Sequence, residues 1–201
     1  AEADAVIAAT IAEYDALGIR FRWAVGPDSA PPDLGARLAA HGLVGERTVV
    51  MAAAIDEVLA ALAVDPAIRV EAVHAGNLEA FVAVSAAGWG CDPEPLRVYQ
   101  RVLLDDAGGR TYNCVAYIDD EPVGVGNLAL FERSAYLIGG VVLPAYRGRG
   151  AYRALTAARL RHGADRGLRL VTTQARAASS APILARLGFV ALTEIEVYSR
   201  R

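Results

Sequence analysis

The most informative stretch of this 201-residue chain runs from Val141 to Leu155 and reads Val-Val-Leu-Pro-Ala-Tyr-Arg-Gly-Arg-Gly-Ala-Tyr-Arg-Ala-Leu. An apolar segment ends at a proline, two glycines follow two positions apart, and a helix-forming run starts directly after them. Gly148 and Gly150 let a ligand approach the backbone closely and let successive N–H groups point into one concavity. The helix start adds its positive end. The stretch therefore predicts a pyrophosphate site with charge-assisted contacts from Arg147, Arg149 and Arg153.

Three other interpretations of this stretch are disfavoured. A nucleotide P-loop needs a lysine after its glycines, and this chain contains no lysine. A Rossmann fingerprint has a different glycine spacing and does not normally occur so late in a chain. An RNA-binding Arg-Gly motif needs repeats, and one copy is present. A plain strand-to-helix turn with solvated arginines remains open, because all twenty basic residues are arginine and arginine alone is weak evidence here.

The composition is that of a globular, mildly acidic protein. Hydrophobic residues make up 54% of the chain, and the formal net charge is −3. A nucleic-acid binder would carry a broad basic surface, so we expect no nucleic-acid partner. No apolar run approaches the ~20 residues that span a bilayer, and residues 1–15 lack the basic head of a signal peptide, which predicts a cytoplasmic protein with no membrane partner. Cys91 and Cys114 lack metal-like spacing, so we expect reduced, buried thiols and no metal.

Hydrophobic periodicity and glycine or proline punctuation predict a mixed α/β (α+β) chain. Helices are expected at 2–17, 33–41, 77–87, 94–104, 150–166 and 181–187. Strands are expected at 19–25, 48–53, 68–72, 111–118, 123–130, 136–143, 168–173 and 194–199, with a Gly108-Gly109 turn before the hairpin 111–130. Residues 56–66 show no clear period and are interpreted as a linker with some helix. Asn77 is expected to cap the helix that it begins.

The first third of the chain resembles the last third in its order of elements. Helix, glycine, strand, helix, glycine, strand describes the N-terminal segment with Gly18 and Gly42. The same order describes the C-terminal segment with Gly167 and Gly188. We interpret this as a half-domain duplication, although an Ala- and Arg-rich chain could also produce the pattern by chance.

Two motifs resemble those of the Gcn5-related N-acetyltransferase (GNAT) family. The segment Val141–Leu155 is similar to the family's acetyl-CoA-binding pattern Arg/Gln-x-x-Gly-x-Gly/Ala, in which Arg147 and Gly150 match and Tyr152 replaces the last small residue. The segment Ile183–Phe189 resembles its second motif, a short helix ending in Gly-Phe. The resemblance covers about residues 68–201. It implies a full GNAT domain at 67–201, with a mixed central sheet flanked by helices, after a degenerate GNAT-like unit and linker at 1–66.

The resemblance also implies a site for acetyl-CoA as cosubstrate. In the family the strand matching 136–143 splays from the next one, the pantetheine arm enters the gap, and a strand N–H polarises the thioester carbonyl. Backbone groups of Val141 and Leu143 are expected to hold that arm. The complete set of expected cofactor-binding residues is Val141, Val142, Leu143, Arg147, Gly148, Arg149, Gly150, Ala151, Tyr152, Arg153 and Ser179.

The acceptor side is less defined by the resemblance. The expected acceptor is a small-molecule or peptide amine, and Trp89 is a candidate for its pocket. Candidate catalytic groups are Glu132 and Tyr136. The family's usual tyrosine acid falls on Leu184, so Ser179, Ser180 or water would have to replace it. An N-acetyltransferase is therefore the first hypothesis, and a non-catalytic acetyl-CoA-binding sensor or assembly module is the second. Whether the chain forms a homodimer stays open at the level of the sequence.

Overall fold

The computed structural model describes residues 2–18, 20–105 and 109–200, and its contacts divide the chain into two units. The first unit comprises the chain up to Met51, residues 174–186 and those from 190 onward. The second unit comprises Ala52–Thr173 and Leu187–Phe189. Both units combine segments that are distant in sequence, whereas the predicted domains 1–66 and 67–201 are contiguous, so that sequence boundary stays a prediction.

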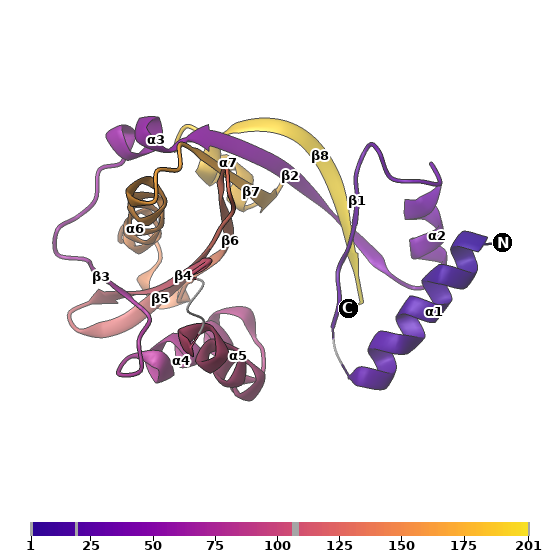
Figure 1. Ribbon diagram of the computed structural model, residues 1–201, viewed down its shortest axis with the longest axis horizontal. Coiled ribbons are helices and arrows are strands. Elements are labelled where there is room, and N and C mark those ends of the chain that lie inside the picture. Colours follow the sequence, from indigo (N-terminus) through magenta and orange to yellow (C-terminus); the bar gives the residue numbers. More distant parts are fainter. Residues whose placement is uncertain (1, 19, 106–108, 201) are drawn as a thin grey trace. The chain divides into compact units, whose positions relative to one another are not determined.

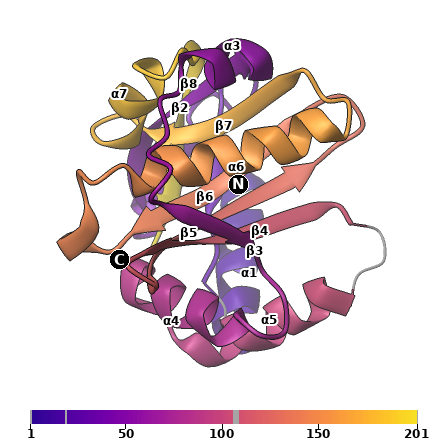
Figure 2. The same ribbon diagram turned by 90° about the vertical axis from the view of Figure 1, so that its left-hand side faces the viewer.

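The second unit is built on the strand order β3-β4-β5-β6-β7. Its strands are β3 (Arg69–Ala72), β4 (Thr111–Ile118), β5 (Glu121–Leu130), β6 (Ala135–Val142) and the beginning of β7 (Leu170–Arg176). Neighbours from β3 to β6 are antiparallel, and β6 and β7 are parallel. Helix α6 (Ala151–Asp165) covers one face, and α4 (Leu78–Trp89) and α5 (Pro93–Asp105) lie on the other (Figure 1). Figure 2 shows the same layers from the α6 side.

Each face of this sheet buries its own apolar cluster. On the α6 face, Leu155 packs among Ala116, Val123 and Val142, and the first two of these are fully buried. On the α4 face, Phe81 packs among Val115, Tyr117 and Val125. Adjacent residues of β4 supply opposite clusters because side chains alternate along a strand. The sheet is therefore covered on both sides, as the mixed α/β prediction requires.

A β-bulge interrupts the pairing of β5 with β6. Asn127 lies opposite Gly139, but the next residue, Leu128, lies opposite Leu137, so Ile138 is the extra residue. A bulge bends its strand and increases the local twist. The parallel ladder of β6 with β7 runs from the pair Ala135–Val171 to the pair Leu137–Thr173, and β6 continues to Val142. The bulge thus begins where this ladder ends.

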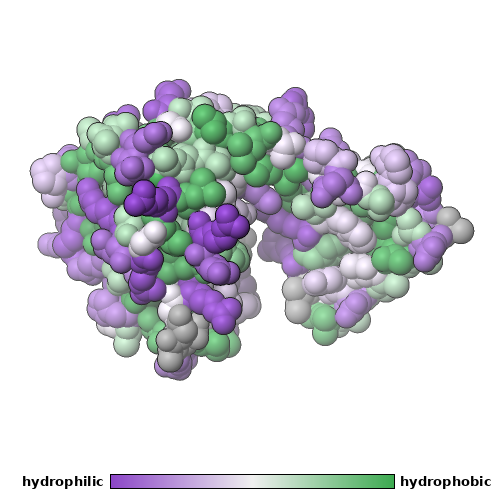
Figure 3. Space-filling model, turned by 45° about the horizontal axis from the view of Figure 1, so that its top comes forward, coloured by the Kyte–Doolittle hydropathy of each residue, from purple (hydrophilic) through white to green (hydrophobic). Residues whose placement is uncertain are grey.

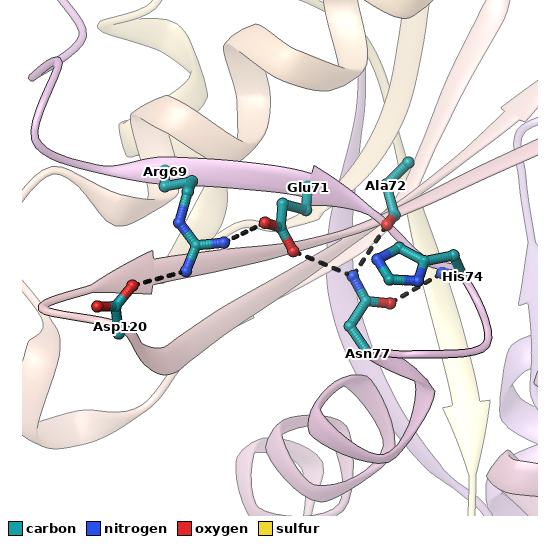
Figure 4. A network of polar contacts seen from close by, with 6 residues as sticks. All are labelled: Arg69, Glu71, Ala72, His74, Asn77 and Asp120. Carbon is teal, nitrogen blue, oxygen red and sulfur yellow. Dashed lines mark hydrogen bonds and ion pairs between the residues drawn. The ribbon is translucent and has the colours of Figure 1, made fainter.

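A polar network fixes the loop that leads into α4 (Figure 4). The Asn77 side chain accepts a hydrogen bond from the His74 N–H (2.8 Å) and donates to the Ala72 carbonyl (3.0 Å) and the Glu71 carboxylate (3.4 Å). Arg69 joins Glu71 to Asp120, the latter at 2.9 Å. Asn77 is the N-cap residue by position, as predicted, but its side chain makes no capping bond and instead ties α4 back to β3.

The first unit contains α1 (Glu2–Leu17), β1 (Trp23–Val25), α2 (Leu34–Ala40), most of β2 (Val44–Ala54), α7 (Ser180–Ala185) and β8 (Val190–Ser199). Its core packs α1 and α2 onto the strands through Ile7, Leu38 and Tyr198. Its strand order is β1-β8-β2, followed by residues 174–176 of β7, whose end hydrogen-bonds to β2 (Ala177 N–H to Arg47 carbonyl, 3.1 Å).

The order β1-β8-β2-β7 is symmetric. Counted from one edge, β1 and β2 take the first and third places, and counted from the other edge, β7 and β8 take these places. The glycines that separate the elements also correspond, because Gly18, Gly42, Gly167 and Gly188 all have positive φ, from 64° to 94°. The shared order of elements is thus present in the structure. Descent from a duplicated half-domain stays a prediction.

Several sequence predictions need correction. The helical part of the segment interpreted as a linker with some helix is α3 (Ile55–Ala61), in which Ile55 and Val58 are buried and acidic residues occupy the first turn. The strand expected at 48–53 is longer, since its polar beginning is held by ion pairs of Arg47 with Glu194 and of Glu46 with Arg176. Cys114 is buried as expected, but Cys91 is only half-buried. Ile19 and Gly108 lie outside the described residues.

Hydrophobic and hydrophilic residues are intermixed on the face shown in Figure 3. Exposed apolar side chains include Val102 on α5 and Val190 and Leu192 on β8. Within the described part of the chain, every helix is too short or too polar to cross a membrane.

Candidate functional site

The glycine-rich segment forms a tight connection between β6 and α6. Strand β6 ends at Val142, a short 3-10 turn (η1, Pro144–Tyr146) follows, and α6 begins at Ala151. Gly148 and Gly150 have φ of 78° and 93°, conformations that other residues rarely adopt. The first helical bond runs from the Ala154 N–H to the Gly150 carbonyl, and no side chain caps the helix. The three preceding N–H groups are therefore donors that the helix does not use.

The three predicted arginines surround this connection and are exposed. Arg147 donates from Nε to the Val142 carbonyl (3.2 Å), which holds its guanidinium beside the end of β6. Arg149 lies 3.6 Å from the Asp119 carboxylate and 5.6 Å from the Tyr146 ring centroid. Arg153 lies in the first turn of α6. The cations and the unused N–H groups suit a doubly charged phosphate ligand, so the residues present fit acetyl-CoA.

The backbone of β6 presents alternate peptide groups to its two edges. The Leu143 N–H is donated to the Val123 carbonyl (2.9 Å), so this donor is committed to the sheet. Alternation along the antiparallel pair directs the Val141 peptide groups to β5 as well. The groups of Gly140 and Val142 then face the other edge. Gly140 was not named by the sequence reasoning, because edge orientation depends on a register that only the structure gives.

Tyr152, the departure from the family pattern, does not fill the glycine connection. Its ring is half-buried in the α6-side cluster, and one ring carbon lies 3.4 Å from where a Cβ of Gly140 would be. Its carbonyl accepts a hydrogen bond from the Thr156 hydroxyl (2.8 Å). The tyrosine ring thus packs on the α6 face of the sheet, where Gly140 of β6 has no side chain that would collide with it.

The α4 face of β6 carries the predicted acceptor-side residues. Trp89 is the last residue of α4, not part of a break, and is 44% exposed. Its Cζ2 lies 3.5 Å from where a Cβ of Gly139 would be. Ala135 faces α6, because its Cβ lies 3.5 Å from the Cβ position of Gly163, so alternation puts the neighbouring Tyr136 on the α4 face. Trp89 and Tyr136 therefore share a face with the bulge.

A row of three amides runs along this face and was missed by the sequence reasoning. Asn127 donates to the Asn113 side-chain oxygen (2.8 Å), and Asn113 donates to the oxygen of Gln100 (2.8 Å). Gln100 is buried in α5 and orients the row. The pairing of Asn127 with Gly139 brings the row to the bulge. Isolated Asn and Gln residues in three separate elements give no local pattern from which a row could have been predicted.

The remaining predicted site residues belong to other elements. Glu132 is exposed in the β5–β6 turn, before the start of β6. Gly140 lies five positions after Ala135, the first residue of β6, which corresponds to roughly 16 Å of strand. Ser179 is the exposed N-cap residue of α7 in the first unit. Leu184, at the family's usual tyrosine position, is 2% exposed. The roles assigned to Glu132 and Ser179 stay predictions.

The groups with strongly shifted pKa values lie in the core and not at the glycine connection. Burial raises the pKa of Cys114 to about 11 and that of Tyr112 to about 12. His162, stacked on Tyr112 with ring centroids 4.1 Å apart, has a lowered pKa because of burial. Among the described residues, no group of three His, Cys, Asp or Glu side chains is arranged to hold a metal ion.

Comparison with known proteins identifies the family. Residues 77–189, more than half of the chain, match the Acetyltransferase (GNAT) family. This chain therefore belongs to the GNAT acetyltransferases, with the mixed α/β fold of that family. No curated protein matches the sequence.

Solved structures with the same fold differ widely in sequence. A functionally unknown conserved protein from Staphylococcus epidermidis has a TM-score of 0.70 at 13% identity, covering 96% of this chain and 80% of its own. A tandem GNAT protein from the clavulanic acid biosynthesis pathway has a TM-score of 0.64 at 19% identity, covering 90% and 63%, so this chain spans less than two thirds of it. The aminoglycoside N-acetyltransferase AAC(6')-Iy, solved with a CoA-linked bisubstrate analogue, has a TM-score of 0.55 at 20% identity, covering 60% and 89%.

Proposed function

We propose that this chain transfers the acetyl group of acetyl-CoA to a primary amine by direct attack. The observation that carries the proposal is the orientation of the Gly140 and Val142 peptide groups, which face away from β5 directly before the Arg147–Gly150 connection. Backbone groups that do not bond to β5 suit a pantetheine arm, and the start of α6 suits its pyrophosphate. Acetyl-CoA, when bound, supplies an acyl group activated as a thioester.

The Gly140 N–H is the donor that would stabilise negative charge on the acyl oxygen. The attacking amine forms an N–C bond, the C–S bond breaks, and the proton that the nitrogen loses passes through water to the departing thiolate. An alkyl amine with a pKa near 10 is ~99.9% protonated at neutral pH, so a group on the enzyme or a water must first take its proton. Tyr136, on the same face as the bulge, and Glu132, in the exposed turn, are the side-chain candidates. Trp89 and Asn127 would form the walls that orient the amine.

A second candidate function is a non-catalytic acetyl-CoA-binding module. It is favoured by Leu184, whose buried aliphatic side chain cannot protonate a leaving thiolate. Under this alternative the glycine connection binds acetyl-CoA but no acetyl group leaves it in the presence of an amine.

Release of free thiol from acetyl-CoA distinguishes the two functions. We would incubate the protein with acetyl-CoA and a panel of aminoglycosides, polyamines, amino acids and N-terminal peptides, and detect the thiol colorimetrically and the acetylated amine by mass spectrometry. The proposal expects amine-dependent release with at least one class. Binding of acetyl-CoA without release from any member of the panel would favour the module.

Glu132→Gln and Tyr136→Phe variants then test the proton acceptor. Because Tyr136 lies on the face of the bulge and Glu132 does not, we expect the Phe variant to lower kcat and to alter its pH profile, and the Gln variant to leave both unchanged. A larger effect of the Gln variant would assign the base to Glu132.

A further inference from the structure

Helix α6 carries a buried arginine that has no acidic partner. Arg159 is 1% exposed, and none of the ion pairs found among the described residues involves it. A guanidinium is a permanent cation in proteins, and burying one without a counter-charge is costly. The side chain must therefore be stabilised by dipoles that point at it.

Those dipoles are three carbonyl groups and one hydroxyl group, and they come from three elements, β5, β6 and α6. Arg159 donates from Nη1 to the Gly139 carbonyl (2.9 Å) and to the Asn127 carbonyl (3.3 Å). Its Nε donates to the Leu155 carbonyl (3.1 Å) and its Nη2 to the Thr156 hydroxyl (3.3 Å). The two strand carbonyls belong to Asn127 and Gly139, the residue pair directly next to the bulge.

Two glycines leave the space that the guanidinium occupies. A Cβ on Gly126 would lie 2.8 Å from Arg159 Nε, and a Cβ on Gly140 would lie 3.2 Å from Nη2. These glycines are opposite each other on β5 and β6. Any larger residue at Gly126 would collide with the arginine. The bulge, the glycine pair and Arg159 thus form one arrangement.

The Gly139 carbonyl and the Gly140 N–H belong to the same peptide unit. In a trans peptide these two groups point in opposite directions, and the only cis bond among the described residues is Ala30–Pro31. The carbonyl end points to Arg159 and β5, so the N–H end points to the open edge of β6. A cation on the carbonyl draws electron density toward the oxygen and strengthens the N–H as a donor, as in chains of hydrogen bonds that polarise one another.

We propose that Arg159 is a positioning residue for acetyl transfer: it fixes the bulge and polarises the Gly139–Gly140 peptide, so that the Gly140 N–H becomes a stronger donor to the acyl oxygen. The expected effect on kcat rests on the proposed function. The expected polarisation of the Gly139–Gly140 peptide does not. The polarised peptide is a property of the free protein and can be observed there.

The electronic part is tested by NMR of the free protein. The ¹³C signal of the Gly139 carbonyl and the ¹H and ¹⁵N signals of Gly140 would be compared between the wild type and Arg159→Met, which keeps side-chain length and removes the charge. The control is Arg161→Met, which removes a charge from an exposed position of the same helix. The proposal expects the Gly139 carbonyl signal to move upfield and the Gly140 N–H proton signal to follow in Arg159→Met only. Signals that stay in place would overturn it.

The kinetic part separates positioning from mere support. Loss of one direct oxyanion donor costs about 10²–10³ in kcat, so loss of its polarisation should cost less, about tenfold, with KM for acetyl-CoA changed by less than about twofold. A purely structural arginine would lower thermal stability but leave kcat of the folded variant unchanged, and that result contradicts the proposal. Acetyl-CoA affinity, measured by calorimetry on both proteins, shows separately whether the proposed function itself has failed.

An Arg159→Lys variant keeps the test decisive if the Met variant does not fold. Lysine retains the buried cation but presents a single ammonium group in place of the guanidinium fork. We expect the Gly139 carbonyl and Gly140 N–H signals of the Lys variant to move upfield from the wild-type positions and kcat to fall, by less than about tenfold. A folded Lys variant with wild-type Gly139 and Gly140 signals and wild-type kcat would overturn the proposal.

Discussion

The ring of Tyr152 lies against Gly140: Cε2 of the tyrosine is 3.4 Å from the point that a Cβ of Gly140 would occupy. Tyr152 stands where the family pattern has a small residue, and Gly140 presents the peptide N–H on which the proposed chemistry depends. The contact therefore places the bulky side chain on the α6 face of the sheet, in the apolar cluster, and not in the Arg147–Gly150 connection.

A Tyr152→Ala variant should lose stability without losing CoA affinity. Removing a half-buried aromatic ring leaves a cavity and should cost about 1–3 kcal/mol of unfolding free energy, measured by urea denaturation. The CoA dissociation constant, measured by calorimetry, should change by less than about threefold, or 0.7 kcal/mol. Tyr152→Phe, which keeps the ring, is the control and should resemble the wild type. A large loss of affinity in the Ala variant would instead place Tyr152 at the ligand.

The local features of the site follow from the sequence, whereas the register between its strands and the contacts between distant residues do not. The positive-φ glycines and the start of α6 were predictable because Gly148, Gly150 and the run after them are contiguous. The bulge at Ile138 was not, because it is a mismatch of register between two strands. Arg159 was not recognised either, since an arginine in an Arg-rich helix suggests solvent. The available signal was the set of glycines on β5 and β6, which implies a space that another group must fill.

The bounds and the burial of helix α3 were not predicted for a related reason, and the sequence indicated only some helix within a linker. Its length is only one to two turns, and Ile55 and Val58 give too short a period to recognise. Its burial comes from contact with α6, which no local pattern encodes. The place of Trp89 at the end of α4 was not predicted either, because the expected helix ended at residue 87 and α4 continues to residue 89.

Trp89→Ala should weaken acceptor binding and leave acetyl-CoA binding intact. The indole borders the bulge on the α4 face, and loss of an aromatic anchor costs about 2 kcal/mol or more in a binding site, roughly a thirtyfold rise in acceptor KM. KM would be measured with the best amine of the panel. Tyr99→Ala, which removes another exposed aromatic from the same unit, is the control and should leave KM unchanged. Equal effects of the two variants would remove Trp89 from the acceptor pocket.

Two glycines at helices should respond to alanine with opposite signs. Gly42 ends α2 with φ of 83°, so Gly42→Ala introduces left-handed strain and should cost about 1 kcal/mol. Gly163 lies inside α6, where a Cβ would meet Ala135 and Ile55 at an ordinary 3.5 Å. Gly163→Ala should therefore stabilise the protein by about 0.5–1 kcal/mol. Denaturant unfolding measures both, and a stabilising Gly42→Ala would contradict the helix end described above.

The buried thiol of Cys114 should make stability fall at alkaline pH. Burial raises its pKa from the ordinary 9.0 to about 11, so the unfolded chain loses this proton first as pH rises. The contribution is fully present below pH 9 and is lost between pH 9 and 11, by about 2–3 kcal/mol. Cys114→Ala should lack most of this loss, and the Tyr112 contribution differs between the two proteins only by the part of its raised pKa that Cys114 causes. Parallel curves of unfolding free energy for the two proteins over this range would show that the thiol is not the cause.

The most direct measurement is thermal unfolding with acetyl-CoA, CoA or ATP in the wild type, Gly148→Asp and Gly148→Asn. Gly148 has open space around its Cβ position, so both variants fit sterically, and only Asp adds a negative charge at the expected phosphate site. Gly167→Asp, at the same φ of 78° and equally open, is the control for backbone strain. A ligand at 100 times its Kd adds about 2.7 kcal/mol, or several degrees. We predict this shift with both CoA species in the wild type and Gly167→Asp, a reduced one in Gly148→Asn, and none in Gly148→Asp or with ATP. No shift with saturating CoA in the wild type would contradict the assignment of this connection as an acetyl-CoA site.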